Sequence, residues 1–366
     1  MTSRLARTAY IDHLRIALTI LVIFHHAAIV YGGAGGWYWK QEPEGSARGL
    51  LFFNAFNQSF FMGFFFLLAG YFTPASYEKK GPLRFLGERL LRLGLPLAIY
   101  FFFISPLTIA LARTADGHPI WKGWGDMIRA RVFEPGPLWF AEALLLFALV
   151  YVTLRKLKTT SPGGGLKSWP STRSLALMAV LTGAVSFAVR LAVPVGKNIF
   201  WLQIGYFPAY IVLFAFGCRA AASQLLDTLD WARVKPWFWT AVVALPVLPI
   251  AIIVNGKNGS FVGGWNLNAA IYALWDPLVA WGTIGSLVYW FRNYIAQPNA
   301  FSAWLAHNAY ATYIVHPPVL VALSVATRSW LIPPLVKFLV IGSLATAGSF
   351  TVAGLVRLIP GTRRVL

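Results

Sequence analysis

The sequence predicts an all-α integral membrane protein, a bundle of about ten transmembrane helices with both termini in the cytoplasm. Composition is the first observation, because 58% of the 366 residues are hydrophobic and only 12% are charged. Soluble domains average about 45–50% apolar and about 25% charged residues. The other two observations are a succession of long apolar runs and the distribution of basic residues between them. This composition excludes an ordinary soluble enzyme and a disordered chain.

Ten apolar runs approach the roughly 20 residues that a spanning helix requires. Gly and Pro occur inside several of them, which membrane helices tolerate when neighbouring groups satisfy the backbone. We expect one membrane domain over residues 1–366, with its core at about 10–355 and a flexible cytoplasmic loop at 155–173. The expected spans are 11–31, 52–72, 93–112, 138–154, 174–193, 201–221, 237–254, 269–290, 303–326 and 331–356.

The net charge of +19 is interpreted as a topology signal. In a soluble protein it would suggest nucleic acid, but here the basic residues lie mostly between apolar runs, so no nucleic acid is expected as a partner. With the N-terminus inside, 19 Lys and Arg residues fall on the cytoplasmic side and 10, Arg190 among them, on the opposite side. This bias and the even number of spans place both termini in the cytoplasm.

The first span carries Arg15 and His26, which are eleven residues apart. That spacing is three helical turns plus about 20°, so both side chains project from one face with a vertical separation of roughly 16 Å. His25 points about 80° away from His26. A buried imidazole is a natural proton acceptor near neutral pH. The alternative is that His26 only joins helices by hydrogen bonds.

Polar residues in the second span form another candidate surface. Asn57 and Gln58 share a helical face with Asn54. They are candidates to line a polar cavity that opens to the outside. A network of hydrogen bonds between helices is the alternative.

Basic residues cluster in the segment 81–92, where Gly81-Pro82 is expected to start a short helix at the cytoplasmic membrane surface. Arg89 and Arg92 are three residues apart and share a face, and Arg84 lies five residues before Arg89. Guanidinium groups suit phosphate oxygens. The alternative role is a topology signal with lipid headgroup contacts.

Two further sites place polar groups inside spans. Glu142 follows Leu138 to Ala141, and we expect it to orient a histidine or to pair with an arginine. Tyr313 and His316 are three residues apart and are candidates to face one cavity, or His316 stabilises a kink at the prolines that follow. No nucleotide-binding, P-loop or zinc pattern occurs, and adjacent His25-His26 suits haem poorly. We therefore expect no metal and no bound cofactor.

Taken together, these residues resemble the integral-membrane acyltransferase family 3 over about residues 10 to 355. Arg15 and His26 resemble its Arg/Lys-x10-His signature, and residues 64–72 (FFFLLAGYF) are similar to its second block. Residues 89–92 (RLLR) look like its cytoplasmic R-x-x-R motif. The segments 138–142 (LWFAE) and 310–317 (YATYIVHP) resemble two further blocks.

The resemblance implies a ten-helix bundle, in a bacterial plasma (inner) membrane, that acylates a hydroxyl of a carbohydrate or glycosylated acceptor. The donor would be cytoplasmic acyl-CoA, a co-substrate, with acetyl as the default group. His26 would act as the base with Arg15 and Glu142 beside it, and Arg84, Arg89 and Arg92 would hold the donor. Acceptor-side candidates would be Asn57, Gln58, Tyr313 and His316.

Two other functions suit the same polar residues. A transporter or flippase for a glycolipid or small metabolite would also need a cavity lined with Asn, Gln, His and Tyr. A structural partner of an envelope assembly would not need His26. Release of a free thiol from the donor separates an acyltransferase from both.

Overall fold

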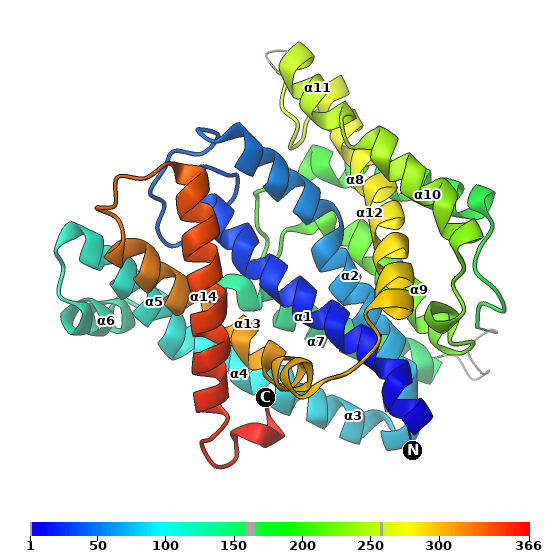
Figure 1. Ribbon diagram of the computed structural model, residues 1–366, viewed down its shortest axis with the longest axis horizontal. Helices are drawn as coiled ribbons and strands as arrows, with labels where there is room; N and C mark the ends of the chain where they lie inside the picture. The colour runs from blue at the N-terminus through cyan, green and yellow to red at the C-terminus, as the bar shows by residue number, and fades with distance from the viewer. Residues whose placement is uncertain (1, 158–164, 257–258) are drawn as a thin grey trace. The chain divides into compact units, whose positions relative to one another are not determined.

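The computed structural model describes residues 2–157, 165–256 and 259–366 (Figure 1). Within these ranges, ten helical stretches are long and apolar enough to cross a membrane, which confirms the predicted number. Six of these spans consist of one helix each, and two more, Gly136–Leu157 and Ile204–Ala221, add a short 3-10 turn before α7 and α9. These helices are α1 (Thr2–Val30), α2 (Arg48–Lys80), α7 (Trp139–Leu157), α8 (Thr172–Ala192), α9 (Phe207–Ala221), α12 (Leu267–Tyr294), α13 (Ala300–Ala326) and α14 (Pro334–Val356).

The third span differs from the sequence expectation. Residues 81–92 were expected to form a separate surface helix, but a continuous helical stretch runs from Pro82 to Asp116. It consists of α3 (Pro82–Arg89), α4 (Leu95–Ile99) and α5 (Ser105–Arg113), joined by π turns at Leu90–Gly94 and Tyr100–Ile104. Pro96 does not interrupt this path because it lies in the first turn of α4, where no helical N–H is required.

The seventh span is also composite. It consists of α10 (Trp231–Ala244) and α11 (Val247–Asn255), which meet at Pro246. The helix α6 (Ile120–Arg129) is too short to span and lies between the third and fourth spans.

Backbone contacts divide the chain into two compact units. Unit 1 comprises Met1–Leu14, Phe56–Pro82 and Tyr151–Pro298, and unit 2 comprises Arg15–Ala55, Leu83–Val150 and Asn299–Leu366. The single-domain assignment stays a prediction. The predicted loop 155–173 contains residues 158–164, which lie outside the described residues.

In unit 1, α12 packs against α8 and α10. The helices α2 and α9 cross at Gly70 and Gly217. A Cβ atom at Gly70 would collide with the carbonyl of Phe214, and one at Gly217 with the carbonyl of Leu67. Small residues allow backbones in membranes to approach closely. Gly70 in the FFFLLAGYF block therefore allows α2 and α9 to pack closely.

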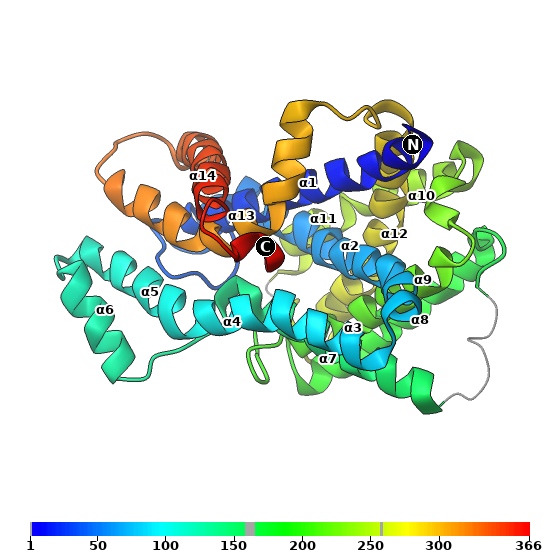
Figure 2. The same cartoon turned by 90° about the horizontal axis from the view of Figure 1, so that it is seen from below.

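In unit 2, α13 packs against α14 and α5, and α5 packs against α6 (Figure 2). The loop 31–47, between α1 and α2, is fixed against α14. Lys337 is 1% exposed and donates to Gln41 Oε1 at 3.0 Å and to the Arg328 carbonyl at 3.3 Å. These bonds hold the loop against the C-terminal end of α13 and the N-terminal end of α14.

Candidate active site

Two histidines from distant parts of the sequence meet in unit 2. His26 on α1 and His316 on α13 approach with His26 Nδ1 and His316 Nε2 3.0 Å apart. His316 Nδ1 lies 2.7 Å from the carbonyl oxygen of Tyr313 on the same helix. His316 is fully buried, whereas His26 is partly exposed. The predicted candidates His26, Tyr313 and His316 are therefore joined in one chain of hydrogen bonds.

The proton positions follow from this chain when both imidazoles are neutral. A carbonyl only accepts, so His316 Nδ1 carries its hydrogen and His316 Nε2 is an acceptor. His26 Nδ1 must then donate to it. The remaining nitrogen, His26 Nε2, is left with an unshared electron pair. This is the atom at which a proton or an acyl group could be accepted.

Pro317 leaves the Tyr313 carbonyl free to accept the hydrogen bond from His316. In an α-helix, the carbonyl of Tyr313 would accept from the N–H of residue 317. Residue 317 is Pro and has no N–H, so this carbonyl is free to bond His316 Nδ1. The His316-Pro317 pair therefore supplies both the imidazole and the unoccupied carbonyl that orients it.

Trp37, in the loop 31–47, stacks on His26. Their ring centroids are 4.1 Å apart with planes inclined by 16°. The neighbouring His25 is buried and its ring is nearly perpendicular to that of His26. Its carbonyl accepts a 2.9 Å hydrogen bond from Asn54. In this arrangement His26, rather than His25, joins the chain of hydrogen bonds.

A second set of polar groups follows Trp37. Tyr38 and Tyr100 hydroxyls lie 2.8 Å apart, and Glu134 also hydrogen-bonds Tyr38. Burial raises the pKa of Tyr38, and the Glu134 carboxylate raises it further. Burial also raises the pKa of the Glu134 carboxyl. The second π turn begins at Tyr100, at this contact.

The start of α7 contacts α13 rather than the imidazoles. The hydroxyl of Tyr313 donates to the carbonyl of Pro137, and Phe140 packs edge-on against the Tyr313 ring. Glu142 was expected to orient a histidine or pair with an arginine. Within the described part of the chain it forms neither a hydrogen bond nor an ion pair. Tyr313 is thus fixed by the carbonyl of Pro137, directly before the LWFAE block, and by Phe140 within it.

The basic motif lies in the same unit. Arg84 and Arg92 are exposed, and Arg84 forms an exposed ion pair with Glu88 at 3.6 Å. Arg89 is half-buried over the Phe85 ring. Because Arg92 lies in a π turn, Arg89 and Arg92 do not have the regular α-helical spacing that the sequence predicted.

Tyr310 connects this motif to the histidines. Its hydroxyl donates to the Arg92 carbonyl at 2.8 Å, and its ring stacks on Tyr313. From Tyr310 to His316 is six residues, about 9 Å along a helix. Arg15 also belongs to unit 2 and lies on the continuous helix α1, as the eleven-residue spacing to His26 assumed.

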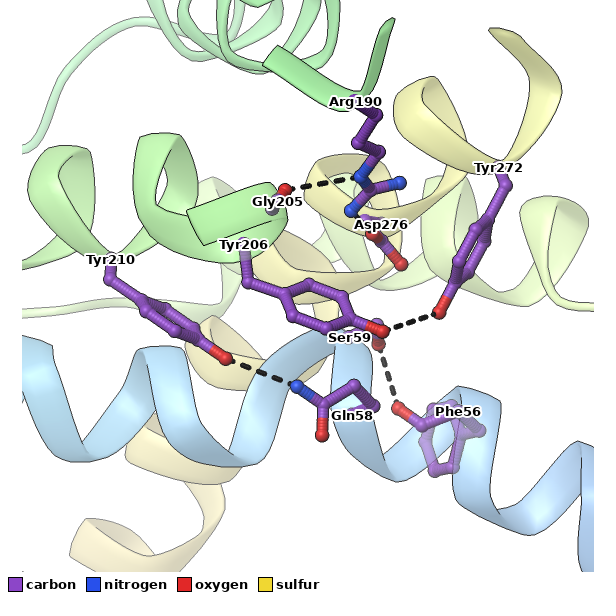
Figure 3. Close-up of polar contacts among 9 residues, drawn as sticks. All are labelled: Phe56, Gln58, Ser59, Arg190, Gly205, Tyr206, Tyr210, Tyr272 and Asp276. Carbon is purple, nitrogen blue, oxygen red and sulfur yellow. Dashed lines mark hydrogen bonds and ion pairs between the residues drawn. The ribbon is translucent and has the colours of Figure 1, made fainter. Parts of the chain in front are cut away.

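Unit 1 contains a separate buried polar cluster (Figure 3). Arg190 is 1% exposed, donates to Asp276 at 2.5 Å and to the Gly205 carbonyl at 3.1 Å. Its guanidinium lies 5.1 Å from the Tyr206 ring centre and 4.9 Å from that of Tyr272. The sequence analysis counted Arg190 among the outer loop charges. This assignment is wrong, because α8 extends to Ala192 and buries the side chain.

The acceptor-side candidates on α2 belong to unit 1. Gln58 donates to the Tyr210 hydroxyl at 3.0 Å, at the edge of the Arg190 cluster (Figure 3). Asn57 is fully buried. Asn54, which was expected to share their face, falls in unit 2.

Sequence reasoning missed Trp37, Tyr38, Tyr100 and Glu134. Trp37, Tyr38 and Glu134 lie in loops, and Tyr100 lies within the third span. The run Trp37-Tyr38-Trp39 in a loop of only 17 residues was the visible signal. No periodicity argument assigns such loop residues to a site.

The fold and this site define a multi-span membrane protein with a paired-imidazole centre. Residues 8–354 match the model of acyltransferase family 3, described as an acyltransferase domain, and the chain belongs to that family. No curated protein and no solved structure matches the chain significantly. The family match covers parts of both units and confirms the resemblance seen in the motifs.

Proposed function

We propose that this membrane acyltransferase moves an acyl group, acetyl by default, from cytoplasmic acyl-CoA to a hydroxyl of a carbohydrate or glycosylated acceptor. His26 is the general base. The observation that carries the proposal is the chain from the Tyr313 carbonyl through His316 to His26. It leaves Nε2 of His26 as the free basic atom.

The donor is assigned to the arginine motif. Exposed Arg84 and Arg92, with Arg89 between them, present guanidinium groups suited to the phosphates of coenzyme A. The acyl-pantetheine arm would then run along α13, from the Tyr310–Arg92 contact towards His316 and His26. In this proposal the thioester lies within the bilayer and the coenzyme A phosphates lie at the inner surface.

The reaction follows from these positions. The acceptor oxygen attacks the thioester carbonyl carbon while its proton moves to His26 Nε2, and the carbonyl electron pair moves to oxygen. The resulting tetrahedral adduct collapses, the C–S bond breaks, and the sulfur takes the proton from His26. An ester and free coenzyme A thiol result. General-base assistance of this kind contributes about 10²–10⁴ in rate.

Roles at the acceptor side are revised by the geometry. Tyr313 and His316 are engaged with Pro137 and His26, which favours positioning roles over acceptor binding. Gln58 and Asn57 stay candidates for acceptor binding, and Arg15 and Glu142 stay candidates beside the base. The same Nε2 atom would also serve if the acyl group passed through His26 itself.

The test uses cells that lack their chromosomal copy and carry either the wild-type chain or His26→Ala. Mass spectrometry of envelope glycans and secreted glycosides should detect ester-linked acyl groups only with the wild type. Inverted membrane vesicles from these cells should release free thiol from acetyl-CoA only when His26 is present. His307→Ala is the matched control, because His307 is an exposed histidine on α13, the helix that carries His316.

Three results would contradict the proposal. Wild-type turnover by a correctly inserted His26→Ala variant would exclude His26 as the general base. Unchanged affinity for acyl-CoA in an Arg89→Ala, Arg92→Ala double variant would exclude these arginines as the donor site. Uptake or export of a glycolipid by the wild type without thiol release would indicate a transporter.

A further inference from the structure

The indole of Trp37 offers a hydrogen-bond donor beside the proposed base. Its Nε1 is buried and has no hydrogen-bond partner among the described residues. A buried N–H without a partner costs about 1–3 kcal/mol. The contact with His26 fixes the indole plane, with the ring centroids 4.1 Å apart.

The position of Trp37 is determined from several sides. Its ring also lies nearly parallel to that of His316, with the centroids 6.0 Å apart, and it meets Tyr38 edge-on. Tyr38 is held by Tyr100, and the loop is held by the Lys337–Gln41 bond. A donor held this firmly keeps its orientation when charge develops near it.

Acyl transfer from a thioester requires such a donor. When the acceptor oxygen bonds to the carbonyl carbon, the carbonyl oxygen becomes an oxyanion. Neither imidazole can stabilise it, because His26 is receiving the acceptor proton and His316 is accepting from His26. In the proposed reaction the attacking hydroxyl is bonded to His26 Nε2, so the thioester carbonyl would lie beside the stacked rings of His26 and Trp37.

We propose that Trp37 Nε1–H is an oxyanion donor of this acyltransferase, an inference that rests on the proposed function. As the carbonyl electron pair moves to oxygen, the oxyanion accepts a hydrogen bond from Trp37 Nε1. When the C–S bond breaks, the pair returns to form the ester carbonyl. The indole keeps its hydrogen throughout, so the proton balance remains between the acceptor, His26 and the departing thiolate.

Two replacements separate the N–H from the stacked ring. Trp37→Phe removes the N–H and shortens the ring. Replacement of Trp37 by 3-benzothienylalanine, through genetic code expansion, keeps both rings and exchanges N–H for sulfur. Trp39→Phe, two residues away in the same loop, is the matched control. The assay measures thiol release from acetyl-CoA by inverted vesicles, with the cells' own envelope as acceptor.

Both Trp37 replacements should lower turnover by about 10²–10³-fold, the usual loss for one oxyanion donor, with the KM for acetyl-CoA unchanged. Trp39→Phe should stay within a few-fold of wild type. Wild-type turnover with benzothienylalanine would overturn the proposal, and a loss confined to Trp37→Phe would assign Trp37 to stacking alone. In either case, inactive His26→Ala would leave the proposed function standing. Active His26→Ala would instead refute the role of His26 as the base in that function.

Discussion

The hydrogen bond between His26 and His316 gives the sharpest test of how the site works. In the reaction His26 becomes an imidazolium. His316 Nε2 accepts a hydrogen bond from Nδ1 of this imidazolium. Hydrogen bonds to charged groups contribute about 1.5–3 kcal/mol. At about 1.36 kcal/mol per factor of ten, His316→Leu should lower turnover by about 10- to 150-fold. It should retain more activity than His26→Ala, which loses the base itself.

His316→Gln distinguishes orientation from packing. The amide oxygen of Gln can accept from His26 Nδ1 as the imidazole nitrogen does, so we expect partial recovery over His316→Leu. Thiol release from acetyl-CoA and formation of the acyl ester should both follow this order. Donor affinity should not change, because His316 touches neither the arginines nor the exposed surface. Equal activity of His316→Gln and His316→Leu, or wild-type turnover by His316→Leu, would refute the reasoning.

Three further predictions follow, one from the imidazole anchor in unit 2 and two from buried contacts in unit 1. Pro317→Ala restores an N–H that competes for the Tyr313 carbonyl and loosens the imidazole anchor, so turnover should fall by about 2- to 12-fold. Gly217→Ala drives a Cβ into a carbonyl of α2 and should lower the melting temperature in detergent, at a cost of about 1–3 kcal/mol. Arg190→Met leaves Asp276 buried without its cation and should lower the free energy of unfolding by about 3–5 kcal/mol. Adding Asp276→Leu should recover most of the lost stability.

Each of these predictions has a matched control. Pro318→Ala changes the adjacent proline, whose missing N–H frees the Ile314 carbonyl instead, and should leave turnover near wild type. Gly49→Ala adds a Cβ where no atom lies within 4 Å and should leave the melting temperature unchanged. Arg129→Met breaks an exposed ion pair with Asp126 and should cost little. Equal effects in test and control variants would show that the stated contact is not responsible.

The span number was predictable because it depends on local properties. Apolar length and basic flanks fix which segments cross a bilayer, and the structure has all ten. The phase of Arg15 and His26 was predictable for the same reason, since both lie on one uninterrupted helix. The third span was misjudged at its start, because Gly81-Pro82 and the basic residues imitate a surface helix while π turns keep the path continuous.

The pairing of side chains was not predictable from these patterns. His26 and His316 are 290 positions apart, and Arg190 and Asp276 are 86 apart. Periodicity shows which way a residue faces on its own helix but not which helix it meets. Arg190 was therefore counted as an outer charge, although its buried partner Asp276 supplies the interactions that water would otherwise provide to the guanidinium. Trp37 lies in a loop, where no period applies.

The helix α13 sets the distance between the proposed donor site and the base. Tyr310 holds the Arg92 carbonyl at one end of a six-residue segment, and His316 holds His26 at the other. Both prolines follow His316, so the segment between these contacts keeps the rise of a regular helix. A proline within it would bend the helix and move one contact relative to the other. Placing the prolines after His316 frees the Tyr313 carbonyl while leaving that spacing intact.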